Sequence, residues 1–169
     1  WLITNAPNRA YQWIINRAGA ILMDARAQGS ASKYELMMPG QQPSGQTIEA
    51  GRATLLPPME GDPAAPLDSL VQLHAARGMN FETIAHELVH LSTAGIIMRA
   101  RNDPNFQVTN PKEYQLVREL TDLYEYAKGT TSALEESLAG DEASLHRIGY
   151  GFSNIDEFIA HGLTNPLIA

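Results

Sequence analysis

Two histidines near the middle of the chain stand four residues apart, with a glutamate directly after the first. They lie in the stretch TIAHELVHLS, which covers residues 83–92. On an α-helix, residues i and i+4 share one face, so the imidazoles of His86 and His90 can point at the same ion. Zinc binds imidazole nitrogen at about 2.0–2.1 Å. The spacing therefore predicts two ligands of a zinc site.

Glu87 neighbours the first predicted ligand and can face the open coordination position of the ion. There it could take the proton from a water molecule whose pKa the zinc ion lowers. This is the HExxH arrangement of zinc peptidases. The structural alternative is an amphipathic helix whose two histidines are partly buried and hydrogen-bonded. We take the zinc site with Glu87 as general base as the leading hypothesis.

A catalytic zinc ion usually takes three protein ligands and one water molecule. The metzincin extension of the motif would need glycine at position 93 and histidine at position 96, and this chain has Thr93 and Ile96. The third ligand must therefore come from further along the chain. The candidates are Glu113, Glu119, Glu125, Glu135, Glu136, Glu142, His146, Asp156, Glu157 and His161.

Glu157, in the stretch NIDEFIAHGL, is the preferred third ligand. Ala160 shares its helical face and is small enough for two helices to approach closely around an ion. His161 shares that face too and could orient a ligand or the bound water. A structural role competes with this one, because Asn154 and Glu157 also have the spacing of a capping box. Glu119 is the second choice.

The two motifs together resemble the gluzincin group of zincins, in which the helix after HExxH supplies a glutamate to zinc. They are most similar to metallopeptidase-like domains embedded in large polyvalent proteins of phages and mobile elements. Those domains typically end in asparagine, a hydrophobic residue, Glu-Glu-Phe, a hydrophobic residue and Ala-Glu, followed by Asn-Pro. Here residues 154–161 and then Asn165-Pro166 correspond. Asp156 replaces one glutamate, and His161 stands where the family often has an acid.

The resemblance covers about the last ninety residues and implies that Glu157 is the third ligand of a single zinc ion. It also implies that SLVQLHA, residues 69–75, is the edge strand before the active-site helix, against which an extended peptide could lie. We expect an endopeptidase rather than an exopeptidase. Its substrate would be a peptide or protein, with its own longer polypeptide as one candidate. The sequence leaves the location of the chain open, with a virion and the host cytoplasm as candidates.

A peptidase also needs a donor to the oxyanion of the tetrahedral intermediate. Tyr150 and His146 are candidates because they come shortly before the last predicted helix, and Tyr124 and Tyr126 are further candidates. The alternative for each tyrosine is a half-buried core position or a surface position. Asp156 is a candidate for a supporting role beside the ligands.

Two further sets of polar residues are expected to lie outside the site. His74 is expected to be an exposed residue. The acidic pairs Glu135-Glu136 and Asp141-Glu142 are expected to be solvated helix ends, since they lack the spacing of a calcium loop.

The helices that would position these side chains follow from apolar periodicity and from end signals. They are predicted over residues 8–28, 80–101, 110–129, 132–139, 141–148 and 154–163. Asn80 and Asn154 are predicted N-caps. Asn110, with Pro111 and Glu113, predicts a capping box. Gly29 is a predicted stop.

The predicted strands fall in the first half of the chain. KYELMM, residues 33–38, predicts a short strand, and residues 47–58 predict either one strand or a hairpin with Gly51 near the bend. DSLVQLHAA, residues 68–76, favours a strand over a helix, and residues 59–66 predict a loop. This order predicts the α+β class, zincin-like, with a small mixed or antiparallel sheet and a mostly helical C-terminal half.

The composition limits the classes of function. The 169 residues fit one domain over 1–169, and 44% hydrophobic with 18% charged residues is not a disordered composition. A net charge of −7 argues against nucleic acid as a partner. The absence of cysteine leaves only His, Asp and Glu to bind a metal. No apolar run predicts membrane insertion.

The ends of the sequence and its function remain open to alternatives. The chain lacks an initiator Met and a signal peptide, which suggests a fragment of a longer polypeptide or a processed mature protein. Besides a zinc peptidase, the chain could be a zincin-fold binding module with little turnover, or a structural domain of a larger protein. The intact His86-Glu87-His90 set favours the peptidase, because a binding module does not need Glu87.

Overall fold

The computed structural model describes residues 4, 6, 8–27, 29–30, 32–38, 50–56, 68–75, 78–138 and 140–164. The chain divides into two compact units, Trp1–Gly95 and Ile96–Ala169. All described strands belong to the first unit, and the described elements of the second unit are helices. This confirms the predicted α+β class with a mostly helical C-terminal half. The predicted loop over 59–66 and the motif residues Asn165 and Pro166 lie outside the described residues.

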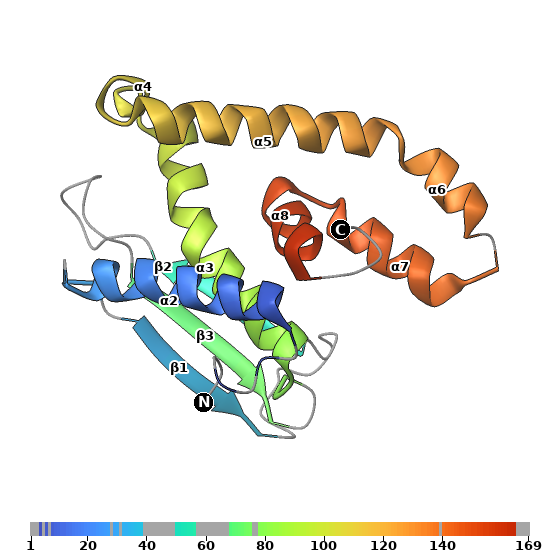
Figure 1. The fold of residues 1–169 in the computed structure, drawn as a ribbon, viewed down its shortest axis with the longest axis horizontal. Coiled ribbons are helices and arrows are strands. Elements are labelled where there is room, and N and C mark those ends of the chain that lie inside the picture. The colour runs from blue at the N-terminus through green and yellow to red at the C-terminus, as the bar shows by residue number, and fades with distance from the viewer. Residues whose placement is uncertain are drawn as a thin grey trace. The chain divides into compact units, whose positions relative to one another are not determined.

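The first unit contains a three-stranded mixed sheet (Figure 1). Its strands are β1 (Ser32–Met37), β2 (Gly51–Leu56) and β3 (Asp68–His74), in the order β1-β3-β2. β1 runs parallel to β3, and β2 runs antiparallel to β3. The small mixed sheet is therefore as predicted. Residues 69–75 were predicted to form an edge strand. This prediction is wrong, because β3 pairs on both sides and every one of its residues is buried or half-buried.

One face of this sheet carries very small side chains on β2. Gly51 pairs with Leu73 and Ala53 pairs with Val71, so all four lie on the same face of the sheet. A Cβ atom placed on Gly51 would lie 2.9 Å from the Thr83 methyl carbon. Thr83 belongs to the helix α3 (Phe81–Asn102). The small residues of β2 therefore allow α3 to approach the sheet closely.

The turn after β3 is tied to the beginning of β2. The His74 N–H donates to the Ala50 carbonyl at 2.9 Å, and the Gly78 N–H donates to the His74 carbonyl at 2.7 Å. His74 is only 8% exposed. The expectation that His74 is exposed is wrong, since its side chain is buried at the end of the central strand β3.

Two helices of the first unit share a hydrophobic core. Helix α2 (Arg9–Ala27) contributes Ile15 and Ala18, which cluster with Leu88 of α3. The bounds of α2 match the predicted helix, and Gly29 after it has a φ of 100°, which confirms the predicted stop. At the start of α3, the Thr83 N–H donates to Asn80 Oδ1 at 2.9 Å, which confirms Asn80 as the N-cap.

Among the described residues, the second unit contains the end of α3 and five further helices. These are α4 (Phe106–Thr109), α5 (Pro111–Gly129), α6 (Thr131–Ser137), α7 (Glu142–Gly151) and α8 (Ile155–Thr164). α4 was not predicted, and α7 runs three residues beyond its predicted end. Tyr150 therefore lies on a helix, and the turn before α8 consists of residues 152–154. Among the described helices, none is both long and apolar enough to cross a membrane.

The capping box predicted for α5 is not formed. Asn110 makes no side-chain hydrogen bond to the first turn of α5. Its side-chain amide instead donates to the Thr109 hydroxyl at 2.9 Å, and its N–H donates to the Phe106 carbonyl. The prediction is wrong because Asn110 also ends the short helix α4, and this role holds its backbone and side chain in another conformation.

The different behaviour of these two asparagines can be tested. We expect Asn80→Ala to lower the free energy of unfolding by about 1 kcal/mol, because the cap bond to Thr83 is lost. Asn110→Ala is the matched control and should cost less, since it removes no cap bond of α5. Urea unfolding followed by circular dichroism measures both. An equal loss in the two variants would contradict the assignment of Asn80 as the cap of α3.

Candidate metal centre

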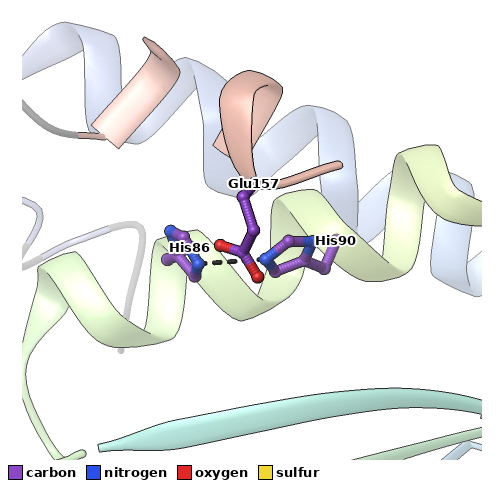
Figure 2. A group of neighbouring side chains, drawn as sticks. All are labelled: His86, His90 and Glu157. Carbon is purple, nitrogen blue, oxygen red and sulfur yellow. Dashed lines mark hydrogen bonds between the residues drawn. The ribbon is translucent and has the colours of Figure 1, made fainter. Parts of the chain in front are cut away.

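The two predicted histidine ligands lie on successive turns of α3 and face each other. Both side chains are half-buried. His86 Nε2 and His90 Nε2 are 3.0 Å apart, and the two rings meet edge to face with centroids 4.6 Å apart (Figure 2). The i, i+4 spacing therefore brings the Nε2 atoms of both rings close together, as the sequence predicted.

The distance between these nitrogens fits a shared ion. A neutral imidazole has one N–H and one lone pair, so one Nε2 must donate here and the other accept. On a tetrahedral zinc ion with bonds of about 2.0–2.1 Å, two nitrogens lie about 3.3 Å apart. A small rotation of either ring would therefore open the pair far enough for an ion to replace the shared proton.

Glu87 lies on the side of α3 that packs against the sheet. It is only 5% exposed, and its neighbours Leu88 and Val89 are also buried. A Cβ atom placed on Gly51 would lie 2.8 Å from Glu87 Oε1, so the carboxylate lies directly against the start of β2. The sequence alone predicted the role of Glu87 but missed this contact. Two small residues at alternate positions, Gly51 and Ala53, were the available signal.

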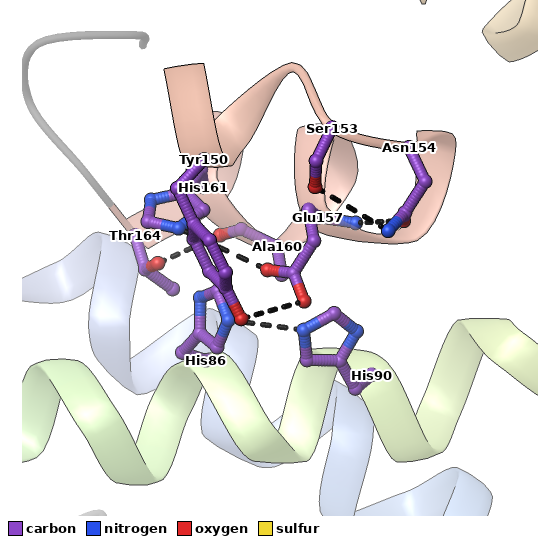
Figure 3. Close-up of polar contacts among 9 residues, drawn as sticks. All are labelled: His86, His90, Tyr150, Ser153, Asn154, Glu157, Ala160, His161 and Thr164. Carbon is purple, nitrogen blue, oxygen red and sulfur yellow. Dashed lines mark hydrogen bonds and ion pairs between the residues drawn. The ribbon is translucent and has the colours of Figure 1, made fainter. Parts of the chain in front are cut away.

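Glu157 lies in the first turn of α8, and its backbone and side chain have separate partners (Figure 3). Its N–H donates to Asn154 Oδ1 at 2.9 Å, which confirms the predicted N-cap. Its carboxylate accepts a hydrogen bond from the Tyr150 hydroxyl at 3.1 Å. The sequence set the cap against the metal ligand as competing roles. Here the cap uses the Glu157 N–H, so the two roles are compatible.

His161 lies beside the same carboxylate. Its Nε2 is 3.9 Å from Glu157 Oε2, and its ring packs edge to face on Tyr150 with centroids 5.5 Å apart. The end of α7 and the first turns of α8 therefore gather Tyr150, Glu157 and His161 into one polar cluster (Figure 3).

The other candidates from the sequence are placed differently. Asp156 is half-buried in the first turn of α8, and His146 is exposed on α7 outside this cluster. Glu119, the second choice for third ligand, is exposed and accepts a hydrogen bond from Gln115 at 2.9 Å. The remaining acidic candidates are exposed as well: Glu113, Glu125, Glu135, Glu136 and Glu142.

The acidic pairs behave as the predicted solvated helix positions. Asp141 is exposed and caps α7 by accepting hydrogen bonds from the Ser144 hydroxyl at 2.6 Å and from the Ser144 N–H at 3.1 Å. These bonds to the Ser144 side chain and backbone hold the pKa of Asp141 below its ordinary value. The stabilisation by this cap is present above the ordinary pKa and is lost as the pH falls through the lowered pKa of the folded state.

An aromatic cluster fixes the turn between α7 and α8. The Tyr124 hydroxyl donates to the Phe152 carbonyl at 3.1 Å, and both rings pack on Phe158 of α8. Tyr124 is buried and Tyr126 is 73% exposed, so these two tyrosines occupy the core and surface positions that were the alternatives to an oxyanion role. Tyr150 is the tyrosine that contacts a predicted ligand.

Comparison with family models, curated proteins and solved structures gave no match to this chain. Within the first unit, two imidazole nitrogens lie 3.0 Å apart and the Glu87 carboxylate is buried. Within the second unit, the Tyr150 hydroxyl donates to the Glu157 carboxylate.

The hydrogen bond from Tyr124 provides a test of how the α7–α8 turn is held. Tyr124→Phe should lower the free energy of unfolding by about 1 kcal/mol, because the part-buried hydrogen bond to the Phe152 carbonyl is lost. Tyr126→Phe makes the same chemical change at an exposed ring and should have almost no effect. Thermal and urea unfolding measure both variants. A Tyr124→Phe protein as stable as the Tyr126→Phe control would contradict this role.

Proposed function

We propose that this chain is a zinc-dependent peptidase in which His86, His90 and Glu157 bind one zinc ion and Glu87 is the general base. The observation that best supports this proposal is the distance of 3.0 Å between His86 Nε2 and His90 Nε2, on a helix in which Glu87 is also buried. Of the described residues, the three proposed ligands form a group that could hold a metal ion, and Figure 2 draws them.

The kind of ligand supports zinc and a catalytic rather than a structural site. Two imidazoles and one carboxylate are a ligand set of catalytic zinc, which leaves the fourth position for water. The chain has no cysteine, so it cannot build the thiolate sites typical of structural zinc. Imidazole also suits other transition metals, and the metal analysis described below distinguishes them from zinc.

Zinc, when bound, supplies a Lewis acid that polarises the scissile carbonyl and lowers the pKa of water. Glu87 accepts one proton as the water oxygen bonds to the carbonyl carbon. It then gives this proton to the amide nitrogen as the carbon–nitrogen bond breaks, so that a carboxylic acid and an amine form. The second proton of the water stays on the acid and then passes to the amine, which gives a carboxylate and an ammonium group.

Tyr150 and His161 support the proposed third ligand. A carboxylate that binds a metal is usually oriented by hydrogen bonds from neighbouring groups. The Tyr150 hydroxyl makes such a bond to Glu157 Oε1. Tyr150 is 48% exposed, so it can also reach a bound substrate, which keeps it as the oxyanion candidate.

The sheet offers a place for an extended substrate. β2 lies at the edge of the described sheet, and Gly51 at its start lies against Glu87. An extended peptide can add to a sheet edge through main-chain hydrogen bonds. A peptide paired with β2 would therefore run beside the proposed base.

Metal analysis and two variants test this proposal. Protein made with zinc in the medium should carry close to one zinc ion per chain by mass spectrometry of its metals, and His86→Ala should lose it. Glu87→Gln should keep the zinc and hydrolyse fluorescently quenched casein at least about 100-fold more slowly, because general base catalysis contributes about 10²–10⁴-fold.

Each result separates one alternative. Wild-type protein that takes up no zinc would refute both the peptidase and a zinc-retaining binding module. Zinc in the wild type without hydrolysis of casein or of the longer polypeptide would favour the binding module. Hydrolysis that survives Glu87→Gln would refute the assigned base.

The third ligand needs a test of its own. Glu157→Gln should weaken zinc binding more than about 100-fold, because the loss of residues outside the ligand shell already costs about 10–100-fold. Glu135→Gln makes the same change at an exposed position of α6 and should leave the zinc affinity unchanged. Competition with a chromophoric chelator measures both affinities. A Glu157→Gln protein that binds zinc as tightly as the Glu135→Gln control would remove Glu157 from the ligand set.

A further inference from the structure

We propose that Gly51 is a positioning residue for Glu87. The side chain that glycine lacks would occupy the space in which the Glu87 carboxylate lies. This inference rests on the proposed function, since it concerns the group that would act as general base. It assigns a role in the reaction to a strand residue without any reactive group.

The contact between the two residues is unusually close. A Cβ atom at position 51 would lie 2.8 Å from Glu87 Oε1 and 2.9 Å from Glu87 Cγ. It would also lie 2.9 Å from the Thr83 methyl carbon, one turn earlier on α3. Real Cβ atoms essentially never make heavy-atom contacts below 3.0 Å, so something must move when Gly51 gains a side chain.

The need for glycine here is one of space and not of backbone conformation. Among the described glycines, only Gly29 and Gly140 have a positive φ. Gly51 is the first residue of β2 and pairs with Leu73 in the ladder. Any residue could adopt this extended conformation, so the close approach of α3 is what excludes a side chain.

The backbone of residues 50 and 51 has little room to retreat. The Ala50 carbonyl accepts the His74 N–H at 2.9 Å. A Cβ atom on Gly78 would collide with the same carbonyl oxygen, so the turn after β3 already touches it. An added methyl group at position 51 would therefore displace the side chains on α3 before it displaced the strand.

The Glu87 side chain is the group that can yield most easily. It has three rotatable bonds, whereas Thr83 is β-branched and stiff. Moving a flexible side chain costs little stability, but a misplacement of about 1 Å in a reacting group can lower the rate about 100-fold. Gly51→Ala should therefore separate activity from stability and from metal binding.

The experiment compares Gly51→Ala with Gly19→Ala, where an added Cβ would meet no atom within 4 Å. Gly51→Ala should keep one zinc ion per chain and lower kcat for quenched casein about 100-fold, with KM changed less than twofold. In wild-type protein without metal, nuclear Overhauser effects should connect the Gly51 Hα protons with the Glu87 Hγ protons and the Thr83 methyl group. The Glu87 resonances should shift in Gly51→Ala and remain in place in Gly19→Ala.

A double variant distinguishes the two side chains that the new methyl group would meet. Thr83→Ser removes the Thr83 methyl carbon and keeps the hydroxyl. If Gly51 acts through Glu87, the Gly51→Ala, Thr83→Ser protein stays slow. Recovery of kcat in this double variant would show that crowding of Thr83 was the cause and would overturn the inference.

The remaining outcomes separate this inference from the proposed function. If the wild type cleaves casein and Gly51→Ala cleaves it within twofold of that rate, the inference is wrong and the peptidase stands. Missing contacts between Gly51 and Glu87 in the wild-type spectra would overturn it as well. If the wild type neither binds zinc nor cleaves, the proposed function fails and this role for Gly51 fails with it.

Discussion

Three successive residues of helix α3 must point in three different directions, each towards its own partner, and the first unit depends on this constraint. Each residue of an α-helix turns about 100° from the one before it. His86 meets His90 on one face, Glu87 lies against the start of β2, and Leu88 joins the core cluster with α2. A shift of α3 by one residue would move Glu87 and Leu88 away from their partners and would turn the His86–His90 pair to another face. Its N-cap at Asn80 and its packing therefore fix the site and the core together.

The buried Glu87 side chain requires space in the sheet against which it packs. The carboxylate needs room beside apolar neighbours, and glycine at position 51 supplies that room without a cavity elsewhere. The backbone at Ala50 is held in turn by the bend after β3, where glycine at position 78 permits a close crossing. Gly51 thus leaves room for the carboxylate on α3, and Gly78 leaves room for the Ala50 carbonyl directly before β2.

Local signals predicted the elements well, and one repeated motif shows where such signals stop. Asn154-x-x-Glu157 and Asn110-x-x-Glu113 have the same spacing, and both precede a helix. Asn154 forms its cap, while Asn110 does not because it also ends α4, which the sequence did not reveal. Features that depend on near neighbours in the sequence were predicted: the helix ends near Gly29 and Asn80, the three strands, and the approach of His86 to His90. Features that depend on distant residues were not predicted: the central position of β3, the burial of His74 and the close approach of α3 to β2.

Gly51 shows why the last of these is hard to recognise in a sequence. A glycine has two structural uses, a backbone conformation that other residues avoid and a position without a side chain. Apolar periodicity and turn statistics address the first use, so a glycine in EAGRA suggests a bend. The pairing with Leu73 places Gly51 inside β2, and the contact with Glu87 identifies the second use. Because that contact joins residues thirty-six positions apart, no local pattern could contain it. A glycine in a regular strand opposite a buried carboxylate is therefore a sign that the position of the carboxylate matters.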